Sequence, residues 1–162
     1  MAENLFVPPD ATREETYQVL IPQIEALIEP EADLIANMAN ITAVLKEAMG
    51  FFWVGFYRRI NNELVLGPFQ GPLACTRIAL DKGVCGACAS RKKTIIVPDV
   101  EKFPGHIACS SASKSEIVVP LVVGNIVKLV LDVDSDQLDD FSEIDQRYLE
   151  EIVSLIKRRH YQ

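Results

Sequence analysis

Two apolar segments, residues 116–123 and 126–134, are separated only by Gly124-Asn125. A two-residue turn of this composition joins antiparallel strands, so the pair predicts a β-hairpin. Both segments are apolar almost throughout, whereas a strand with one face in water alternates apolar and polar residues. The hairpin is therefore expected to be buried on both faces, with other parts of the chain covering it.

Helical patterns precede the sheet-forming part of the chain. Thr12 followed by Glu15 forms a capping box, which predicts a helix from there to about Ile28. Pro22 is expected to bend or interrupt this helix, because proline lacks a backbone N–H group. From residue 31 to residue 49, apolar residues recur every three or four positions, which predicts a second helix.

Strand, turn and capping patterns predict the remaining elements. In chain order they are strands at 51–60, 63–71 and 75–80, a short helix at 83–92, a strand at 94–97, a long loop at 98–116, the hairpin, and a helix capped by Ser142 and Asp145. Hairpin-linked strands with helices grouped at the ends favour an α+β fold with a mostly antiparallel sheet. Residues 1–162 are expected to form a single domain, with residues 1–11 as a loose N-terminal arm.

The composition excludes several classes of protein. The chain has 162 residues, of which 49% are hydrophobic, and this is enough for one globular core. Its net charge of −7 disfavours binding to nucleic acids and to anionic membranes. Neither a signal peptide nor an apolar run of about 20 residues is evident, so no membrane association is expected and the cytoplasm is the expected location.

All four cysteines lie between residues 75 and 109, at positions Cys75, Cys85, Cys88 and Cys109. Such clustering indicates metal or redox chemistry. Cys85-Gly-Ala-Cys88 has the spacing of a thioredoxin-like dithiol but lacks the surrounding βαβ pattern. Zinc bound by the cysteines, with or without His106, has suitable ligands but only one closely spaced pair. Cys85 is expected at a helix N-terminus, where the helix dipole favours a thiolate.

Acidic residues stand at the ends of two apolar strands. Asp132 and Asp134 are two apart, so on a strand they project from the same face. Neighbouring carboxylates repel each other, and either a cation lies between them or one has a raised pKa and can act as an acid. Glu116 stands in the same way at the start of the preceding strand. The alternative is that all three carboxylates are ordinary solvated residues at strand ends.

Aromatic residues dominate the first predicted strand. Trp53 and Tyr57 are four apart, so they share one face of that strand. Core packing accounts for many such runs. Beside carboxylates and thiols, the same residues would instead form the wall of a pocket for a small ligand with an apolar, polarisable group.

Several spaced motifs together resemble one known family. In chain order they are FFWVGFY, LVLGPFQGPLAC, GVCG, FPGHIACSS, KSEIVVP and LDVDS. This combination is similar to the free methionine-(R)-sulfoxide reductases, which have a GAF fold, and the resemblance covers about residues 15–158. It implies a GAF-like six-stranded, mostly antiparallel sheet flanked by N- and C-terminal helices. It also implies action on the free amino acid, often as a homodimer, without a metal or an organic cofactor.

The resemblance also implies which residues form the site. The family's redox cysteines, active-site carboxylates and pocket aromatics correspond to Cys75, Cys85 and Cys109, to Glu116, Asp132 and Asp134, and to Trp53 and Tyr57. Two positions depart from the family pattern. Cys88 stands where a small residue without a thiol is usual, and Lys128-Leu129 stands where an apolar residue and glycine are usual.

The chemistry of these residues agrees with the implied reaction. A sulfoxide oxygen leaves only after protonation, so a carboxyl with a raised pKa can donate the proton while a thiolate attacks the sulfur. We expect Cys109 to be the nucleophile and Cys75 to resolve the resulting sulfenic acid as a disulfide, which thioredoxin then reduces. Cys85 competes for either role. At least one of the carboxylates is expected to stay ionised and bind the substrate ammonium.

A function of another class stays open from the sequence. A GAF domain can be a sensory module that binds a small ligand without catalysis. A sensory module has no need of three thiols beside three carboxylates, and no attached output domain is evident in this chain. The reductase is therefore the preferred hypothesis.

Overall fold

A six-stranded sheet with the order β3-β2-β1-β6-β5-β4 forms the centre of the molecule. The computed structural model describes residues 4–107 and 109–162. The strands are β1 (Trp53–Ile60), β2 (Glu63–Gln70), β3 (Arg77–Ala79), β4 (Ile95–Val97), β5 (Ser115–Val123) and β6 (Ile126–Ser135). Every neighbouring pair is antiparallel, and β5 and β6 form the hairpin expected from the sequence. The predicted α+β fold, with a six-stranded antiparallel sheet, is confirmed.

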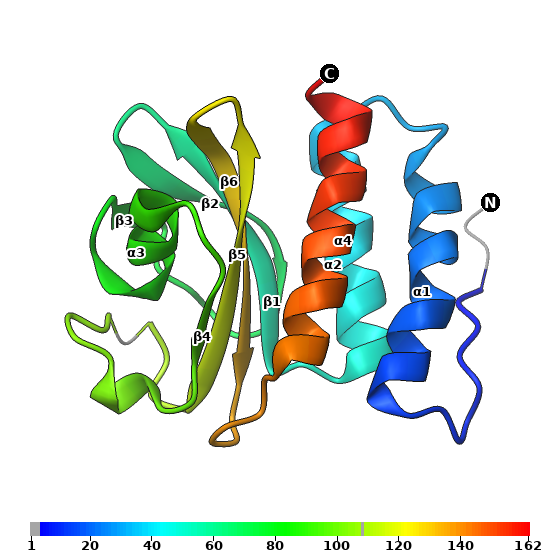
Figure 1. Ribbon diagram of the computed structural model, residues 1–162, viewed down its shortest axis with the longest axis horizontal. Helices are drawn as coiled ribbons and strands as arrows, with labels where there is room; N and C mark the ends of the chain where they lie inside the picture. The colour runs from blue at the N-terminus through cyan, green and yellow to red at the C-terminus, as the bar shows by residue number, and fades with distance from the viewer. Residues whose placement is uncertain (1–3, 108) are drawn as a thin grey trace.

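Helices lie on both sides of this sheet (Figure 1). They are α1 (Arg13–Ile28), α2 (Leu34–Met49), α3 (Gly83–Arg91) and α4 (Glu143–His160). Helices α2 and α4 pack on one face of the sheet with α1 outside them, and α3 lies on the opposite face with the loops (Figure 1). In residues 4–107 and 109–162, no helix combines the length and the apolar character needed to cross a bilayer.

Alternate residues of the same strands build two separate cores. Phe56 and Ile117 belong to the core between the sheet and helices α1, α2 and α4. Their chain neighbours Tyr57 and Val118 belong to a second core on the α3 side. Both faces of the central strands are thus buried, which explains why the hairpin segments are apolar almost throughout.

Helix α1 begins as predicted but passes through its proline. The Thr12 hydroxyl accepts a hydrogen bond from the Glu15 N–H at 3.2 Å, and the Glu15 carboxylate accepts one from the Thr12 N–H in return. The predicted interruption at Pro22 is wrong, because α1 continues to Ile28. Proline removes one backbone hydrogen bond, whereas Leu20 and Ile24 on either side of it are fully buried in the core and hold the helix in place.

The N-terminal segment lies against α1 from residue 4 onward. Leu5 and Val7 pack on the core, and the Gln23 side chain accepts a hydrogen bond from the Phe6 N–H and donates one to the Phe6 carbonyl. These contacts hold the described part of the expected loose arm on the helical layer. The first three residues of that arm lie outside the described residues, and the single domain over 1–162 stays a prediction.

The long segment between β4 and β5 runs along the α3 side of the sheet. It contains a short 3-10 helix, Val100–Lys102, and the Val100 N–H donates to the Lys114 carbonyl at 2.9 Å. Further along, Ile107 packs on the start of α3, where a Cβ added to Gly83 would lie 3.4 Å from Ile107 Cγ1. The segment therefore brings Cys109 close to the N-terminus of α3.

Candidate active site

The strand register gathers the acidic residues on one face of the sheet. Glu116 of β5 is paired with Asp134 of β6, and Asp134 is in turn paired with Trp53 of β1. Asp132 lies two residues earlier on β6, opposite Gly55. Because side chains alternate along a strand, all of these positions face the α3 side.

A one-residue irregularity produces this register. Near the turn Val122 pairs with Val127, but Leu121 pairs with Leu129, so β6 contributes one extra residue at this point. Without the shift, Glu116 would lie opposite Val133, whose side chain is in the other core. The irregularity thus places the Glu116 carboxyl beside the two aspartates.

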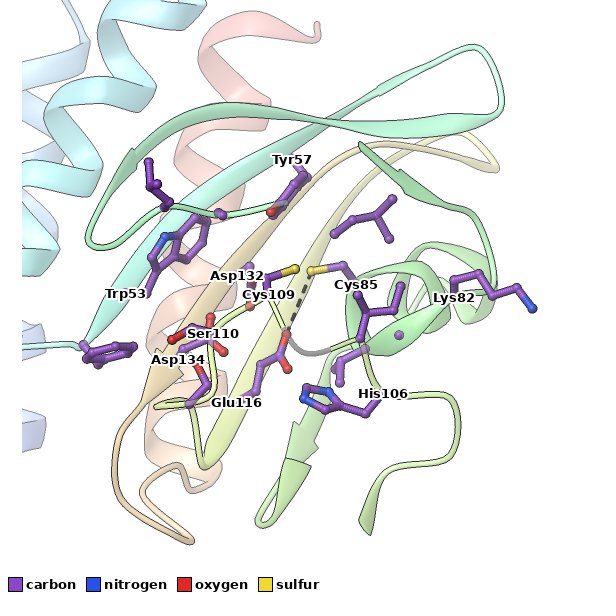
Figure 2. A pocket seen from close by; sticks show the side chains of 18 residues that line it. Trp53, Tyr57, Lys82, Cys85, His106, Cys109, Ser110, Glu116, Asp132 and Asp134 are labelled. Carbon is purple, nitrogen blue, oxygen red and sulfur yellow. Dashed lines mark hydrogen bonds between the residues drawn. The ribbon is translucent and has the colours of Figure 1, made fainter. Parts of the chain in front are cut away.

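A cleft of about 570 Å³, counting its open mouth, lies between this face, α3 and the segment before β5. Seven of the eight predicted site residues line it, namely Trp53, Tyr57, Cys85, Cys109, Glu116, Asp132 and Asp134 (Figure 2). The eighth, Cys75, does not line the cleft but is bonded to Cys109. The structure therefore brings all eight residues into one site.

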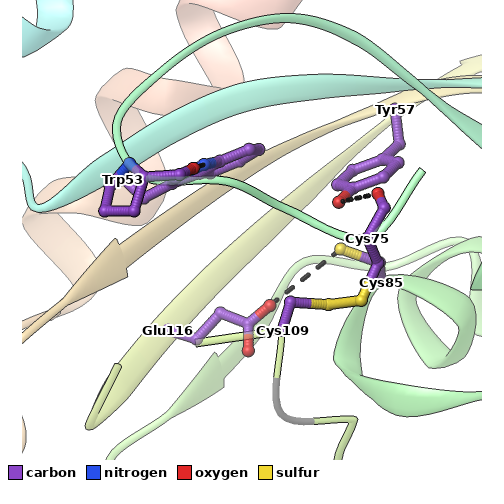
Figure 3. The surroundings of a disulfide bond; sticks show 7 residues. Trp53, Tyr57, Cys75, Cys85, Cys109 and Glu116 are labelled. Carbon is purple, nitrogen blue, oxygen red and sulfur yellow. Dashed lines mark hydrogen bonds between the residues drawn. A yellow bond between two sulfur atoms is a disulfide. The ribbon is translucent and has the colours of Figure 1, made fainter. Parts of the chain in front are cut away.

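Cys75 and Cys109 form a disulfide across 34 residues of sequence, with their Cα atoms 5.5 Å apart (Figure 3). Cys109 is exposed and Cys75 is half-buried. The bond joins the two cysteines for which the sequence predicts attack and resolution. It also argues against a zinc site built from all four cysteines, because bonded sulfur atoms are not thiolate ligands.

Cys85 and Cys88 are free and buried in α3. The Cys85 Sγ atom donates a hydrogen bond to Glu116 Oε1 at 3.9 Å (Figure 3), whereas Cys88 donates to the Val118 carbonyl at 3.5 Å and lies outside the cleft. Burial, followed by the negative charges of Asp132 and Glu116, raises the pKa of Cys85 well above its usual value. The expected thiolate at Cys85 is therefore wrong, because desolvation outweighs the helix dipole.

Two of the three carboxyl groups are buried, and the third, that of Asp134, is half-buried. Glu116 and Asp132 are only 6% and 7% exposed, so the alternative of solvated strand ends is wrong for these two residues. Burial raises the pKa of each group, to about 6 for Asp132, while the neighbouring charges raise the pKa of Glu116 and Asp134 further. The site thus holds carboxyl groups whose raised pKa values favour the protonated form, which can act as an acid.

The buried Asp132 makes the stability of the protein depend on pH. Its pKa rises from 3.8 to about 6 on folding. A raised pKa contributes stability that is fully present below about pH 4 and is lost as the pH rises to about 6, a change of about 3 kcal/mol. Asp132→Asn should therefore reduce the fall in the free energy of unfolding over this pH range.

Urea unfolding of both proteins at a series of pH values measures this difference. Asp136→Asn is the matched control, because Asp136 lies just beyond β6 and is exposed. The control should keep the pH dependence of the parent protein. If the free energy of unfolding of Asp132→Asn depended on pH as in the parent protein, the raised pKa assigned to Asp132 would be contradicted.

Stacked aromatic rings form one wall of the cleft. Trp53 and Tyr57 have ring centroids 6.1 Å apart, and the Trp53 indole N–H donates to the Pro72 carbonyl at 3.1 Å. The Tyr57 hydroxyl donates to the Cys75 carbonyl at 2.8 Å, which ties the disulfide to this wall (Figure 3). The indole lies over Gly55, where an added Cβ would be 2.4 Å from Trp53 Cη2. Gly55 is thus required for the flat wall.

The backbone N–H groups at the start of α3 are a part of the site that the predicted site residues do not include. Gly83, Val84 and Cys85 line the cleft, and the N-cap residue Lys82 makes no side-chain cap. The first hydrogen bond of this turn is donated by the Gly86 N–H, so the three preceding N–H groups point toward the open end of the helix. Such a terminus favours an anion. Its sequence signal is the glycine-rich start of the segment at 83–92.

Known proteins are similar to this chain in sequence and in fold. The sequence profile of the GAF domain family matches residues 31–158. "GAF domain-containing protein A" of Dictyostelium discoideum is 60% identical over 158 residues, which are 96% of this chain and 99% of the relative. Free methionine-R-sulfoxide reductase of Escherichia coli (strain K12) is 42% identical over 145 residues, 89% of this chain and 88% of that enzyme.

A solved structure is similar over nearly the whole chain. It is the X-ray structure of free methionine-R-sulfoxide reductase from Neisseria meningitidis in complex with its substrate, which is 48% identical, with a TM-score of 0.94, over 98% of this chain and 95% of that chain. This chain belongs to the GAF domain family of free methionine-R-sulfoxide reductases. The family resemblance read from the spaced motifs is thereby confirmed. For a reductase of this family, the cleft with its disulfide and carboxyls is the candidate active site.

Proposed function

We propose that this protein reduces free L-methionine-(R)-sulfoxide to methionine. The observation that carries the proposal is the Cys75–Cys109 disulfide at a cleft lined by the carboxyl groups of Glu116, Asp132 and Asp134, of which the first two are buried. A thiol pair supplies the two electrons for reduction, and a carboxyl with a raised pKa supplies the proton that a sulfoxide oxygen needs before it leaves.

Each part of the substrate has a complementary group in the cleft. The ammonium binds Asp132 and Asp134, and its charge favours their ionised forms. The carboxylate binds the open N–H groups at the start of α3. The S-methyl group contacts the rings of Trp53 and Tyr57. Methionine within a peptide lacks both charges, so the site selects the free amino acid.

The reaction then proceeds in balanced steps. Glu116 protonates the sulfoxide oxygen while the Cys109 thiolate attacks the sulfur, and methionine leaves with Cys109 as a sulfenic acid. The Cys75 thiol condenses with the sulfenic acid, which releases water and forms the disulfide. The dithiol of thioredoxin reduces this disulfide and is itself oxidised. The disulfide seen in the structure corresponds to the oxidised end of this cycle.

Chromatography that resolves the two sulfoxide diastereomers tests the function. The protein is incubated with free L-methionine-(R,S)-sulfoxide and dithiothreitol, and only the R epimer should disappear, because a fixed thiol and a fixed acid align with one configuration at sulfur. Equal loss of both epimers, or comparable reduction of a methionine sulfoxide peptide, would contradict the proposal. Ligand binding without methionine formation would support the sensory alternative.

Removal of Cys75, the proposed resolving cysteine, should allow the first turnover but prevent the later ones. Cys75→Ser should form about one equivalent of methionine and then stop when thioredoxin is the reductant, because the Cys109 sulfenic acid has no partner. Quenched-flow assays with and without thioredoxin measure this burst. Cys88→Ser is the control and should cycle normally, since Cys88 lies outside the cleft. Sustained turnover by Cys75→Ser would assign resolution to another cysteine.

A further inference from the structure

Three potential metal-ligand atoms, one sulfur and two carboxylate oxygens, lie close together in the cleft. The Sγ atom of Cys85 and carboxylate oxygens of Glu116 and Asp132 all lie within 4.8 Å of one another, and all three residues are buried. The distance from Cys85 Sγ to Glu116 Oε1 is 3.9 Å. In a tetrahedral zinc site with Zn–S of about 2.3 Å and Zn–O of about 2.1 Å, the same two atoms lie about 3.6 Å apart. The separation of the Cys85 and Glu116 atoms is therefore close to that in such a site.

A second observation points to a bound cation. Asp132 Oδ1 is buried and has no hydrogen-bond partner among the described residues, although the side chain faces the cleft (Figure 2). No ion pair within residues 4–107 and 109–162 involves Glu116, Asp132 or Asp134. A buried acceptor without a partner is costly, and a buried carboxylate normally has a countercharge. Among the described residues, Asp132 Oδ1 thus has neither a hydrogen-bond donor nor an ion-pair partner.

We propose that Cys85, Glu116 and Asp132 bind one thiophilic divalent cation, with Zn²⁺ as the fitting ion. A thiolate with two carboxylates suits Zn²⁺, whereas Mg²⁺ and Ca²⁺ prefer oxygen ligands alone. Three protein ligands leave a fourth position for water toward the open mouth of the cleft. On binding, the cation displaces the protons of the Cys85 thiol and the Glu116 carboxyl, both protons pass to water, and no electrons are transferred.

The cation would regulate the reductase. Asp132 would bind either the cation or the substrate ammonium, so Zn²⁺ should compete with the sulfoxide; this step rests on the proposed function. Cys85 is not part of the disulfide. Zn²⁺ binding itself is therefore expected in the oxidised protein, with Cys75 and Cys109 bonded to each other.

Co²⁺ binding to the oxidised protein, without reductant, tests the site. Co²⁺ replaces zinc and gives a thiolate charge-transfer band, and Cys85 and Cys88 are the only free thiols in this state. The band should saturate at one equivalent of Co²⁺, and one equivalent of Zn²⁺ should abolish it. The Cys88→Ser variant should keep the band, whereas the Cys85→Ser variant should not show it. Glu116→Gln and Asp132→Asn should each weaken Co²⁺ binding at least about tenfold. Circular dichroism shows whether each variant is folded.

The outcomes separate this inference from the proposed function. Absence of the band in the parent protein, or a band that depends on Cys88 and not on Cys85, would overturn the metal site whatever the activity. Sulfoxide reduction with neither Co²⁺ nor Zn²⁺ binding would leave the reductase intact and refute the inference. The band without any reduction of sulfoxide would support the metal site while the proposed function fails. In an active enzyme, Zn²⁺ should raise KM for the sulfoxide without lowering kcat.

Discussion

The Cys109→Ser variant should lose at least about 10³-fold in kcat/KM for free methionine-(R)-sulfoxide, because removal of a nucleophile costs several orders of magnitude. Cys109 is exposed and lines the cleft, so its sulfur can reach a bound sulfoxide and ionise in contact with water. A serine hydroxyl does not provide the thiolate. Steady-state assays with dithiothreitol measure the effect, because this reductant removes the need for a resolving cysteine.

Two matched variants make this test specific. Cys85→Ser should retain more activity than Cys109→Ser, since burial and the adjacent Asp132 and Glu116 charges raise the pKa of Cys85 and disfavour its thiolate. Cys88→Ser should be close to the parent protein, because its thiol lies outside the cleft. A larger loss in Cys85→Ser than in Cys109→Ser would transfer the nucleophilic role to Cys85.

The fold was predictable where local patterns and burial agree. The cap at Ser142 and Asp145 begins α4, and the Gly124-Asn125 turn joins β5 to β6. The spacing of two between Asp132 and Asp134 correctly placed both on one face. These features depend on neighbours in sequence, so they are visible without the rest of the fold.

The assembly of the site was not predictable from spacing alone. Glu116 meets Asp134 only because β6 contributes one extra residue, Lys128, opposite Leu121 and Val122, and a single charged residue in an apolar run does not by itself predict a shift of register. The disulfide joins residues 34 positions apart, and its partners came from the family resemblance. The thiol of Cys85 was misjudged for the same reason, since the helix start is visible in the sequence and its burial against β5 and β6 is not.

Glu116→Gln should lower kcat by about 10²–10⁴-fold with little change in KM, which is the usual effect of losing a positioned acid. Burial and the charges of Asp132 and Asp134 raise the pKa of Glu116 well above its usual value, which favours the protonated form that can donate a proton. As the pH rises through this pKa, the proton is lost and kcat should fall. Glutamine preserves the shape of the side chain but has no titrating proton, so the fall of kcat at high pH, which is the alkaline limb of the profile, should be absent from the Glu116→Gln variant.

Comparison with Asp134→Asn distinguishes proton donation from substrate binding. Both variants should lose at least about tenfold in kcat/KM, but the loss in Asp134→Asn should fall mainly on KM, because an ammonium contact is present in the ground state and the transition state alike. Stopped assays over a range of substrate concentrations and pH separate kcat from KM, and unfolding curves show that each variant is folded. If Glu116→Gln keeps kcat and its alkaline limb, Glu116 is not the acid, and the proton must come from another group in the cleft. If both variants match the parent protein, the Glu116 and Asp134 carboxyls have no part in the chemistry, and the thiol steps of the mechanism remain with Asp132 as the only carboxyl still to be tested.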